Sequence, residues 1–209
     1  MNWLIDWWLE TGPTPNSWTA VLLSGFAGAL LTLSVQGIIH WWRKPVLRLL
    51  FTEKVRGCRV ATPAWNFQDQ QTGVIGTSAE QAYLRLKVAN PGRTFAKNVS
   101  VCVTHIAFAD GTPFSEEVLD LKVALTSDRD NFNLASKGHR FVDFAHCDRR
   151  NHATALHFDF AIIPARLHER RLGPGRYEMQ VFASAENAAS VHASCRFQWD
   201  GTLEGLRIV

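Results

Sequence analysis

A stretch of 21 residues without a charged side chain, Thr19 to Ile39, constrains most strongly what this chain can fold into. Thirteen of these residues are Ala, Val, Leu, Ile or Phe, three are Gly, and five are uncharged polar residues. A helix rises about 1.5 Å per residue, so this length matches the roughly 30 Å hydrocarbon core of a bilayer. Pro13, Pro15 and Pro45 stand where a helix should be interrupted. We therefore predict a transmembrane helix over residues 18–42.

The flanks of this stretch carry side chains that suit a membrane interface. Aromatic rings favour the headgroup layer, and basic residues favour the cytoplasmic side. The interface anchors that we predict are Trp18, Trp41, Trp42, Arg43 and Lys44. One alternative is a buried core helix, and another is a cleaved signal peptide. A signal peptide needs a basic start and a shorter apolar run. No Lys or Arg precedes position 43, so we expect the segment to be retained.

The distribution of basic residues predicts the orientation of the helix. Residues 43–57 contain five Lys or Arg, whereas residues 1–17 contain none. Such residues are retained on the cytoplasmic side, which puts the N-terminus outside a bacterial inner membrane and the remaining chain in the cytosol. Cys58, Cys102, Cys147 and Cys195 would then be reduced thiols. Residues 1–17 would be a short extracytoplasmic or interfacial segment, and the reverse topology is the alternative.

One face of the predicted helix combines small and polar residues. Small residues spaced four apart let two helix backbones approach closely, and hydroxyl or amide groups can hydrogen-bond across the contact. The residues of this predicted association face are Ala20, Ser24, Gly25, Gly28, Ala29, Thr32 and Gln36. The pattern favours a homo-oligomer or a pairing with another membrane protein. The alternative is that the helix simply tolerates small residues and that Gln36 reaches the nearby membrane surface.

From Val46 onward apolar residues alternate with polar ones, and we predict that residues 43–57 form a basic juxtamembrane segment and the first strand. Alternation with a period of two is typical of strands that bury one face. The clearest runs are 84–88, 99–103, 119–125, 156–160, 177–183 and 191–199, and shorter candidates are 46–51, 58–61 and 141–144. Turn-forming residues separate them. We predict a mainly β domain over 58–209, an antiparallel β-sandwich, with irregular loops over 62–80 and 126–137.

Several motifs resemble those of CARDB-type, immunoglobulin-like bacterial domains. Val88-Ala89-Asn90-Pro91-Gly92 followed by residues 96–101 resembles their strand–turn–strand motif, and Gly173-Pro174-Gly175-Arg176-Tyr177 resembles a late hairpin. The resemblance covers about residues 82–199. It implies an immunoglobulin-like fold and a binding module, and it does not imply a reaction.

The residues that could carry chemistry do not form a known catalytic motif. The sequence has no Gly-rich phosphate loop, no Cys-x-x-Cys pair and no Gly-x-Ser-x-Gly turn. Zinc would need three or four converging ligands, and the candidates for such a set are His146, Cys147, Asp148, His152 and His157. Scattered surface histidines explain the same pattern, and Cys195 has the parity of a core residue. We predict no metal, no cofactor and no enzymatic activity.

Basic residues in the second half of the chain suggest a further surface. The predicted basic surface consists of Arg149, Arg150, Arg166, Arg170 and Arg171. It could contact anionic lipid headgroups or phosphate, or it could be a solvated sheet edge. A total of 22 basic against 19 acidic residues, without interleaved aromatic residues, argues against nucleic acid as the partner.

These observations predict a single-pass membrane protein whose cytosolic β-sandwich binds, senses or scaffolds an unknown cytosolic protein partner. The alternatives are a membrane-disrupting effector of a bacterial defence system, gated by the soluble domain, and an extracytoplasmic binding domain in the reverse topology.

Overall fold

The computed structural model describes residues 18–68, 73, 75–124, 131–150, 153–161 and 172–209. The chain divides into two compact units, residues 1–43 and residues 44–209. The first unit contains helix α2, Trp18–Trp42, with the predicted bounds. Its residues Val21–Ile39 are long and apolar enough to cross a membrane, and none of this window is buried.

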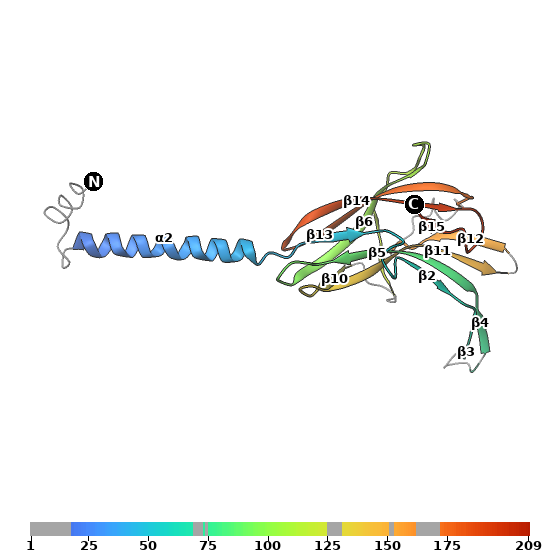
Figure 1. The fold of residues 1–209 in the computed structure, drawn as a ribbon, viewed down its shortest axis with the longest axis horizontal. Helices are drawn as coiled ribbons and strands as arrows, with labels where there is room; N and C mark the ends of the chain where they lie inside the picture. The colour runs from blue at the N-terminus through green and yellow to red at the C-terminus, as the bar shows by residue number, and fades with distance from the viewer. Residues whose placement is uncertain (1–17, 69–72, 74, 125–130, 151–152, 162–171) are drawn as a thin grey trace. The chain divides into compact units, whose positions relative to one another are not determined.

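Residues 44–209, which we call the β-domain, contain two antiparallel sheets that pack together, as predicted (Figure 1). In the β5 sheet the strand order is β1 (Arg48–Leu50), β5 (Glu80–Ala89), β11 (His139–Arg150), β12 (Ala153–Phe158), with β2 (Arg59–Thr62) on β5 and β9 (Lys122–Val123) on β11. In the β13 sheet the order is β10 (Asn131–Leu134), β6 (Ala96–Phe108), β13 (Gly175–Ala185), β14 (Ala188–Trp199), β15 (Arg207–Ile208), with β7 (Pro113–Ser115) and β8 (Leu119–Asp120) on β6.

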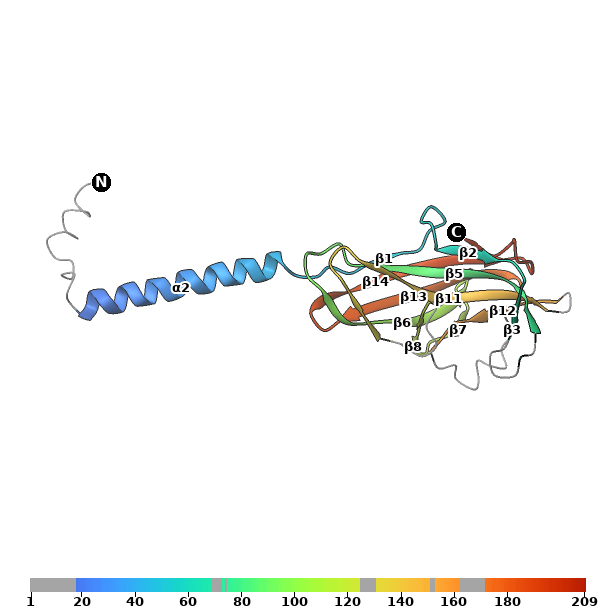
Figure 2. The ribbon, with the colours of Figure 1, turned by 90° about the horizontal axis from the view of Figure 1, so that it is seen from below.

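The core lies between the two sheets because each long strand buries alternate residues. On β5, Leu84, Leu86 and Val88 are buried, and on β13 the buried residues recur in the same way. Phe144 of β11 meets Phe197 of β14 edge to face, with ring centroids 5.6 Å apart. Figure 2 shows the long strands of the two sheets running along the domain. The alternating runs at 84–88, 99–103, 177–183 and 191–199 are thus confirmed as strands.

The run at 119–125 was predicted as one strand and is two short strands in different sheets. β8 pairs with β6 in one sheet, and β9 pairs with β11 in the other. Leu121, between them, donates its backbone N–H to Val101 O in the β13 sheet, and it bridges to Phe160. Both sheets face the same core, so the alternation continues unchanged while the chain crosses between them. Leu125 lies outside the described residues.

Two segments predicted as irregular loops contain strands. Within 62–80, β3 (Trp65–Gln68) pairs with β4 (Ile75–Ser78) in a separate two-stranded sheet, which Figure 1 shows projecting beyond the main sheets. Within 126–137, the described part contains β10, which pairs with β6. The four residues of β10 do alternate between polar and apolar, but a run of four is the shortest that alternation can mark as a strand.

β11 is much longer than the predicted run at 141–144 because a β-bulge interrupts its alternation. Asp143 pairs with Arg85 and Ala145 pairs with Leu84, so Phe144 is an extra residue with no partner on β5. Phe144 and Ala145 are both buried. A bulge shifts the inward and outward positions by one residue, and Asp143 and His146 consequently share the outward face of the β5 sheet.

Candidate functional site

Three aromatic rings form a row across the outward face of the β5 sheet. The strand register places Tyr83 of β5 opposite His146 of β11, and His146 opposite His157 of β12. The centroids of the stacked Tyr83 and His146 rings are 5.3 Å apart, and those of the stacked His146 and His157 rings are 5.2 Å apart. The Arg85 guanidinium carbon lies 5.1 Å from the centre of the Tyr83 ring. We call these four side chains the ring row.

Carboxylates compensate the charges of the ring row. The Nδ1 atom of His146 lies 2.9 Å from each carboxylate oxygen of Asp159. Arg85 Nε donates to Asp143 Oδ1 over 2.8 Å. The third carboxylate belongs to Asp148, which is almost fully buried and lies 3.5 Å from His157 Nε2. Arg85, His146 and His157 therefore each have their own acidic partner.

This arrangement changes the acidity of the groups involved. Burial of the His146 ring acts to lower its pKa, but the hydrogen bond and the charge of Asp159, with further carboxylates nearby, raise the pKa above its ordinary value. Burial raises the pKa of the Asp143 carboxyl, although Arg85 opposes this shift. The pKa of Tyr83 is raised by burial and by the same carboxylates. The site favours a protonated imidazole held against a carboxylate.

The strand geometry separates Cys147 from the other described zinc candidates. His146 and His157 are neighbours on the outward face, whereas Cys147 points into the core and is fully buried. His152 lies outside the described residues. Across the part of the chain that the structure describes, no group of three His, Cys, Asp or Glu side chains could hold a metal ion. Burial also raises the pKa of Cys147 to about 11 and that of Cys195 to about 12, so both thiols are protonated at neutral pH.

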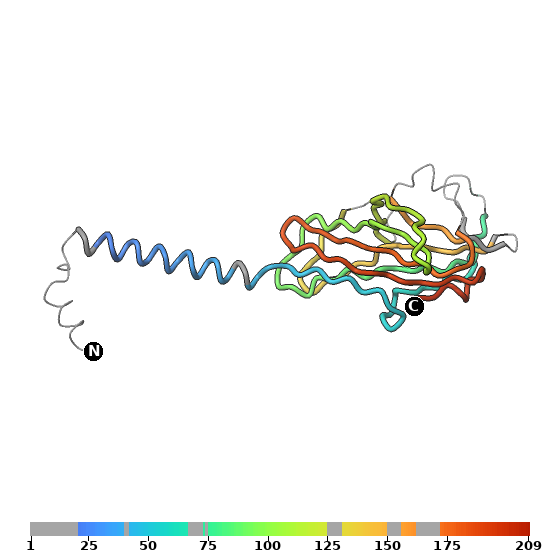
Figure 3. The backbone as a smooth tube through the Cα atoms, turned by 90° about the horizontal axis from the view of Figure 1, so that it is seen from above, coloured from blue at the N-terminus to red at the C-terminus, as the bar shows by residue number. Residues whose placement is uncertain are grey.

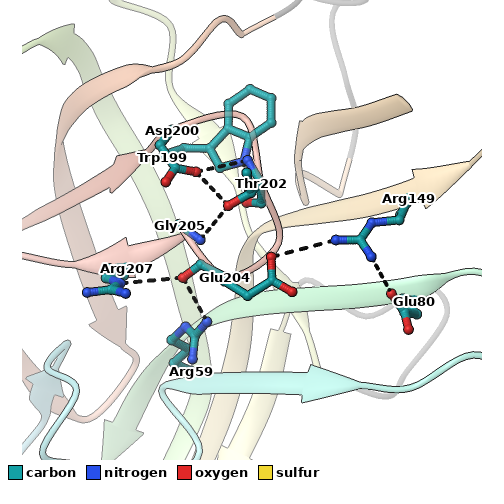
Figure 4. Close-up of polar contacts among 9 residues, drawn as sticks. All are labelled: Arg59, Glu80, Arg149, Trp199, Asp200, Thr202, Glu204, Gly205 and Arg207. Carbon is teal, nitrogen blue, oxygen red and sulfur yellow. Dashed lines mark hydrogen bonds and ion pairs between the residues drawn. The ribbon is translucent and has the colours of Figure 1, made fainter. Parts of the chain in front are cut away.

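The described member of the predicted basic surface takes part in ion pairs. Arg149 donates to Glu80 over 3.0 Å, and its other nitrogen lies 3.6 Å from a Glu204 carboxylate oxygen (Figure 4). Arg59 of β2 donates to the backbone oxygens of Glu204 and Leu206, in the segment that also contains the Glu204 carboxylate. These contacts fasten the C-terminal segment to the β5 sheet. The remaining predicted side chains, those of Arg150, Arg166, Arg170 and Arg171, lie outside the described residues.

The predicted association face has no packing partner within the described chain. A Cβ atom added at Gly25 or Gly28 would meet nothing within 4 Å. Ser24 and Thr32 donate their hydroxyl groups to carbonyls of their own helix. Of the predicted membrane anchors, Trp42, Arg43 and Lys44 are exposed, and the side chains of Trp18 and Trp41 lie outside the described residues. The side chain of Ala20, in the association face, also lies outside them.

Sequence reasoning missed a cluster of four segments at the end of the β-domain where the chain enters it at Lys44. We call residues 44–48, 90–98, 133–140 and 186–187 the basic end. Figure 3 shows the turns near 92, 137 and 186 gathered there. The buried Asn90 side chain joins them: Oδ1 accepts from Val46 N and Gly92 N, both over 3.1 Å, and Nδ2 donates to Thr94 O over 2.7 Å.

Further contacts fix the basic end as one unit. Asn90 Nδ2 also donates to Leu134 O and Ala135 O. Ser136 donates its hydroxyl to Gly92 O over 2.9 Å, and the Asn187 amide bonds both Lys97 N and Phe95 O. Gly92 is required because a Cβ atom there would lie 2.6 Å from Val46 N and 2.8 Å from Lys44 O.

The basic end has a strong excess of positive charge. Its single acidic residue is Glu186, which accepts a hydrogen bond from Asn98. Its basic residues, all exposed, are Lys44, Arg48, Arg93, Lys97, Lys137 and Arg140. The chain as a whole has nearly balanced charge, 22 basic and 19 acidic residues. The turn motif Asn90-Pro91-Gly92 can be recognised in the sequence. No sequence pattern indicates which distant basic residues lie near this turn in the folded chain.

Comparisons with known proteins give little further information. No family model and no curated protein matches the sequence. Among solved structures, the chain has a distant likeness to a family 123 glycoside hydrolase from Clostridium perfringens, with 13% sequence identity and a TM-score of 0.31. The match covers 57% of this chain and 21% of the hydrolase chain. A likeness of this size carries no argument about activity, and the resemblance to CARDB-type domains stays a prediction.

Proposed function

We propose that this chain is a bacterial inner-membrane protein in which α2 anchors a cytosolic β-domain that serves as a binding or scaffolding module. The observation that supports anchoring most directly is the complete exposure of the apolar window Val21–Ile39. In water, a helix with apolar side chains on every side would be costly, whereas in a bilayer the same surface is satisfied by lipid. The β-domain has its own core and needs no cover from the helix.

The cytosolic location is supported by charge and by cysteine. Residues 43–57 contain five Lys or Arg, which are retained on the cytoplasmic side. Cys58, Cys102, Cys147 and Cys195 are all free and buried, as suits a reducing compartment. A non-enzymatic role is part of this proposal: the ring row is internally charge-paired, and burial raises the pKa of the Cys147 and Cys195 thiols.

We further propose that the helix associates with a second copy through its small-residue face. Gly25 and Gly28 meet no other part of the described chain, so close approach by another helix would give these glycines a function. Among the described residues the exposed Gln36 amide has no hydrogen-bonding partner, and an amide in hydrocarbon gains from a partner across an interface. A symmetric pair of helices would supply that partner.

Membrane extraction and thiol labelling together test anchoring and orientation. The native cysteines are buried, so they give a low background to an impermeant thiol reagent. We expect Ser17→Cys to be labelled in intact spheroplasts and the exposed Ser190→Cys to be labelled only after permeabilisation. The full-length chain should also stay in the membrane pellet after alkaline extraction.

Each alternative gives a different result. Labelling of Ser190→Cys before permeabilisation would establish the reverse topology. A product shortened at its N-terminus would identify α2 as a signal sequence. Recovery of the full chain in the soluble fraction would refute anchoring altogether.

A further inference from the structure

We infer that the basic end of the β-domain is a docking surface for the anionic lipid headgroups of the membrane that holds α2. This inference rests on the proposed anchoring, and it adds a second contact between protein and membrane. The observations behind it are the short link to the helix, the charge of the four segments and their fixed arrangement.

Only a short stretch of chain connects α2 to the basic end. α2 ends at Trp42, and the Lys44 carbonyl already lies against Gly92 within the β-domain. Two residues of extended chain reach at most about 7 Å. If α2 spans the bilayer, the basic end is the part of the β-domain that the chain holds at the membrane surface.

The charges at this end match that environment. Six exposed Lys or Arg and one Glu give the segments a net charge that the rest of the domain does not share. Elsewhere in the β-domain, Arg149 is paired with Glu80 and Glu204, and Arg85 is paired with Asp143. Anionic lipids of the cytoplasmic leaflet attract basic residues near the surface, each improving the binding equilibrium by about fivefold.

An exposed aromatic residue extends the surface. Phe95 is 45% exposed and stands between the basic residues Arg93 and Lys97. Its carbonyl is held by the Asn187 amide over 2.9 Å. Aromatic and apolar side chains beside basic ones favour the boundary between headgroups and acyl chains. The hydrogen bonds of Asn90 hold the contributing turns in place before any lipid binds, so little conformational entropy would be lost on docking.

Hydrogen exchange on the full chain in lipid nanodiscs tests this inference. One preparation contains phosphatidylcholine alone, and the other contains about 30% phosphatidylglycerol, which supplies the anionic surface. We expect the amides of residues 92–97 and 135–140 to exchange about fivefold more slowly in the anionic discs. The difference should vanish near 1 M salt, where the screening length is about 3 Å. Residues 109–112, in a turn outside the basic end, should exchange equally in both.

Two matched variants decide whether the effect belongs to this surface. The variant Lys97→Glu/Lys137→Glu/Arg140→Glu should lose the protection in anionic discs. A control with the same change of charge at exposed positions elsewhere, Arg176→Glu/Arg196→Glu/Arg207→Glu, should keep it. Thermal melting of both variants checks that they remain folded.

The outcomes separate this inference from the proposed anchoring. A chain that does not co-elute with the discs contradicts anchoring before any exchange is measured. A chain that co-elutes but exchanges equally in both lipids overturns the docking surface and leaves anchoring intact. Equal loss of protection in both variants would also overturn it, because the effect would then follow net charge and not this surface.

Discussion

Asn90 offers the most demanding test of how the β-domain is held together. Its side chain is fully buried and links the entry of the chain to two turns. Oδ1 accepts from Val46 N and Gly92 N, and Nδ2 donates to Thr94 O as well as to two carbonyls at the end of β10. Replacing it with alanine removes all of these bonds at once.

The magnitude follows from the three shorter bonds, at 2.7–3.1 Å. A protein hydrogen bond contributes about 1 kcal/mol net, and a buried group left without a partner costs somewhat more. We therefore expect Asn90→Ala to reduce the free energy of unfolding of the β-domain by about 3 kcal/mol. For a domain of this size, that corresponds to a fall in Tm of roughly 6–12 °C.

The assay is thermal and urea unfolding of the full chain in mild detergent, followed by near-ultraviolet circular dichroism. Asn187→Ala is the control, because Asn187 also makes two hydrogen bonds but is exposed. Water can replace its partners, so its loss should cost less than about 1 kcal/mol. Asn90→Asp should be as damaging as Asn90→Ala, since it points a carboxylate oxygen at Thr94 O.

A result within about 0.5 kcal/mol of the parent protein for Asn90→Ala would refute this reasoning. It would mean that the turns are held by their own backbone conformations and that the buried amide is not the element joining them. The hydrogen bonds of Asn90 would then not explain the fixed arrangement of the basic end.

Two further predictions concern the helix and the ring row. Gln36→Leu should lower the yield of crosslinked dimer in membranes several-fold, because one hydrogen bond between transmembrane helices contributes about 0.6–2 kcal/mol; an unchanged yield would contradict association through this face. For His146, whose pKa is raised, the pair with Asp159 should contribute stability that is complete below pH of about 6.5 and lost as pH rises through the folded pKa. The difference in unfolding free energy between the parent and Asp159→Asn should therefore shrink with rising pH, and an NMR titration that places the His146 pKa below the ordinary value would disprove the assignment.

The ring row and the basic end show two ways in which a β-domain gathers functional groups. In the ring row, strand register aligns side chains from three neighbouring strands, and a bulge brings Asp143 to the same face as His146. At the basic end, a single buried amide joins segments that lie 44 residues before it and 44 residues after it in sequence. In the ring row, the charged side chains are paired with one another, whereas the basic side chains of the basic end are exposed.

The sequence by itself determined the elements whose signal is local. The bounds of α2 follow from the apolar stretch and the prolines around it, because hydropathy and helix breaking act over adjacent residues. The long strands β5, β6, β13 and β14 follow from alternation, which reports burial on one face. The burial of Cys195 was predicted from the same parity, and its exposed fraction of 1% confirms it.

Only the tertiary structure decided which of these elements meet. The bulge at Phe144, the crossing of the chain between sheets at Leu121 and the pairing of β10 with β6 depend on contacts between residues far apart in sequence. No local pattern encodes them, because alternation reports that a residue faces the core and not which sheet it joins. For the same reason, the lysines of the basic end became one surface only when packing brought their four segments together.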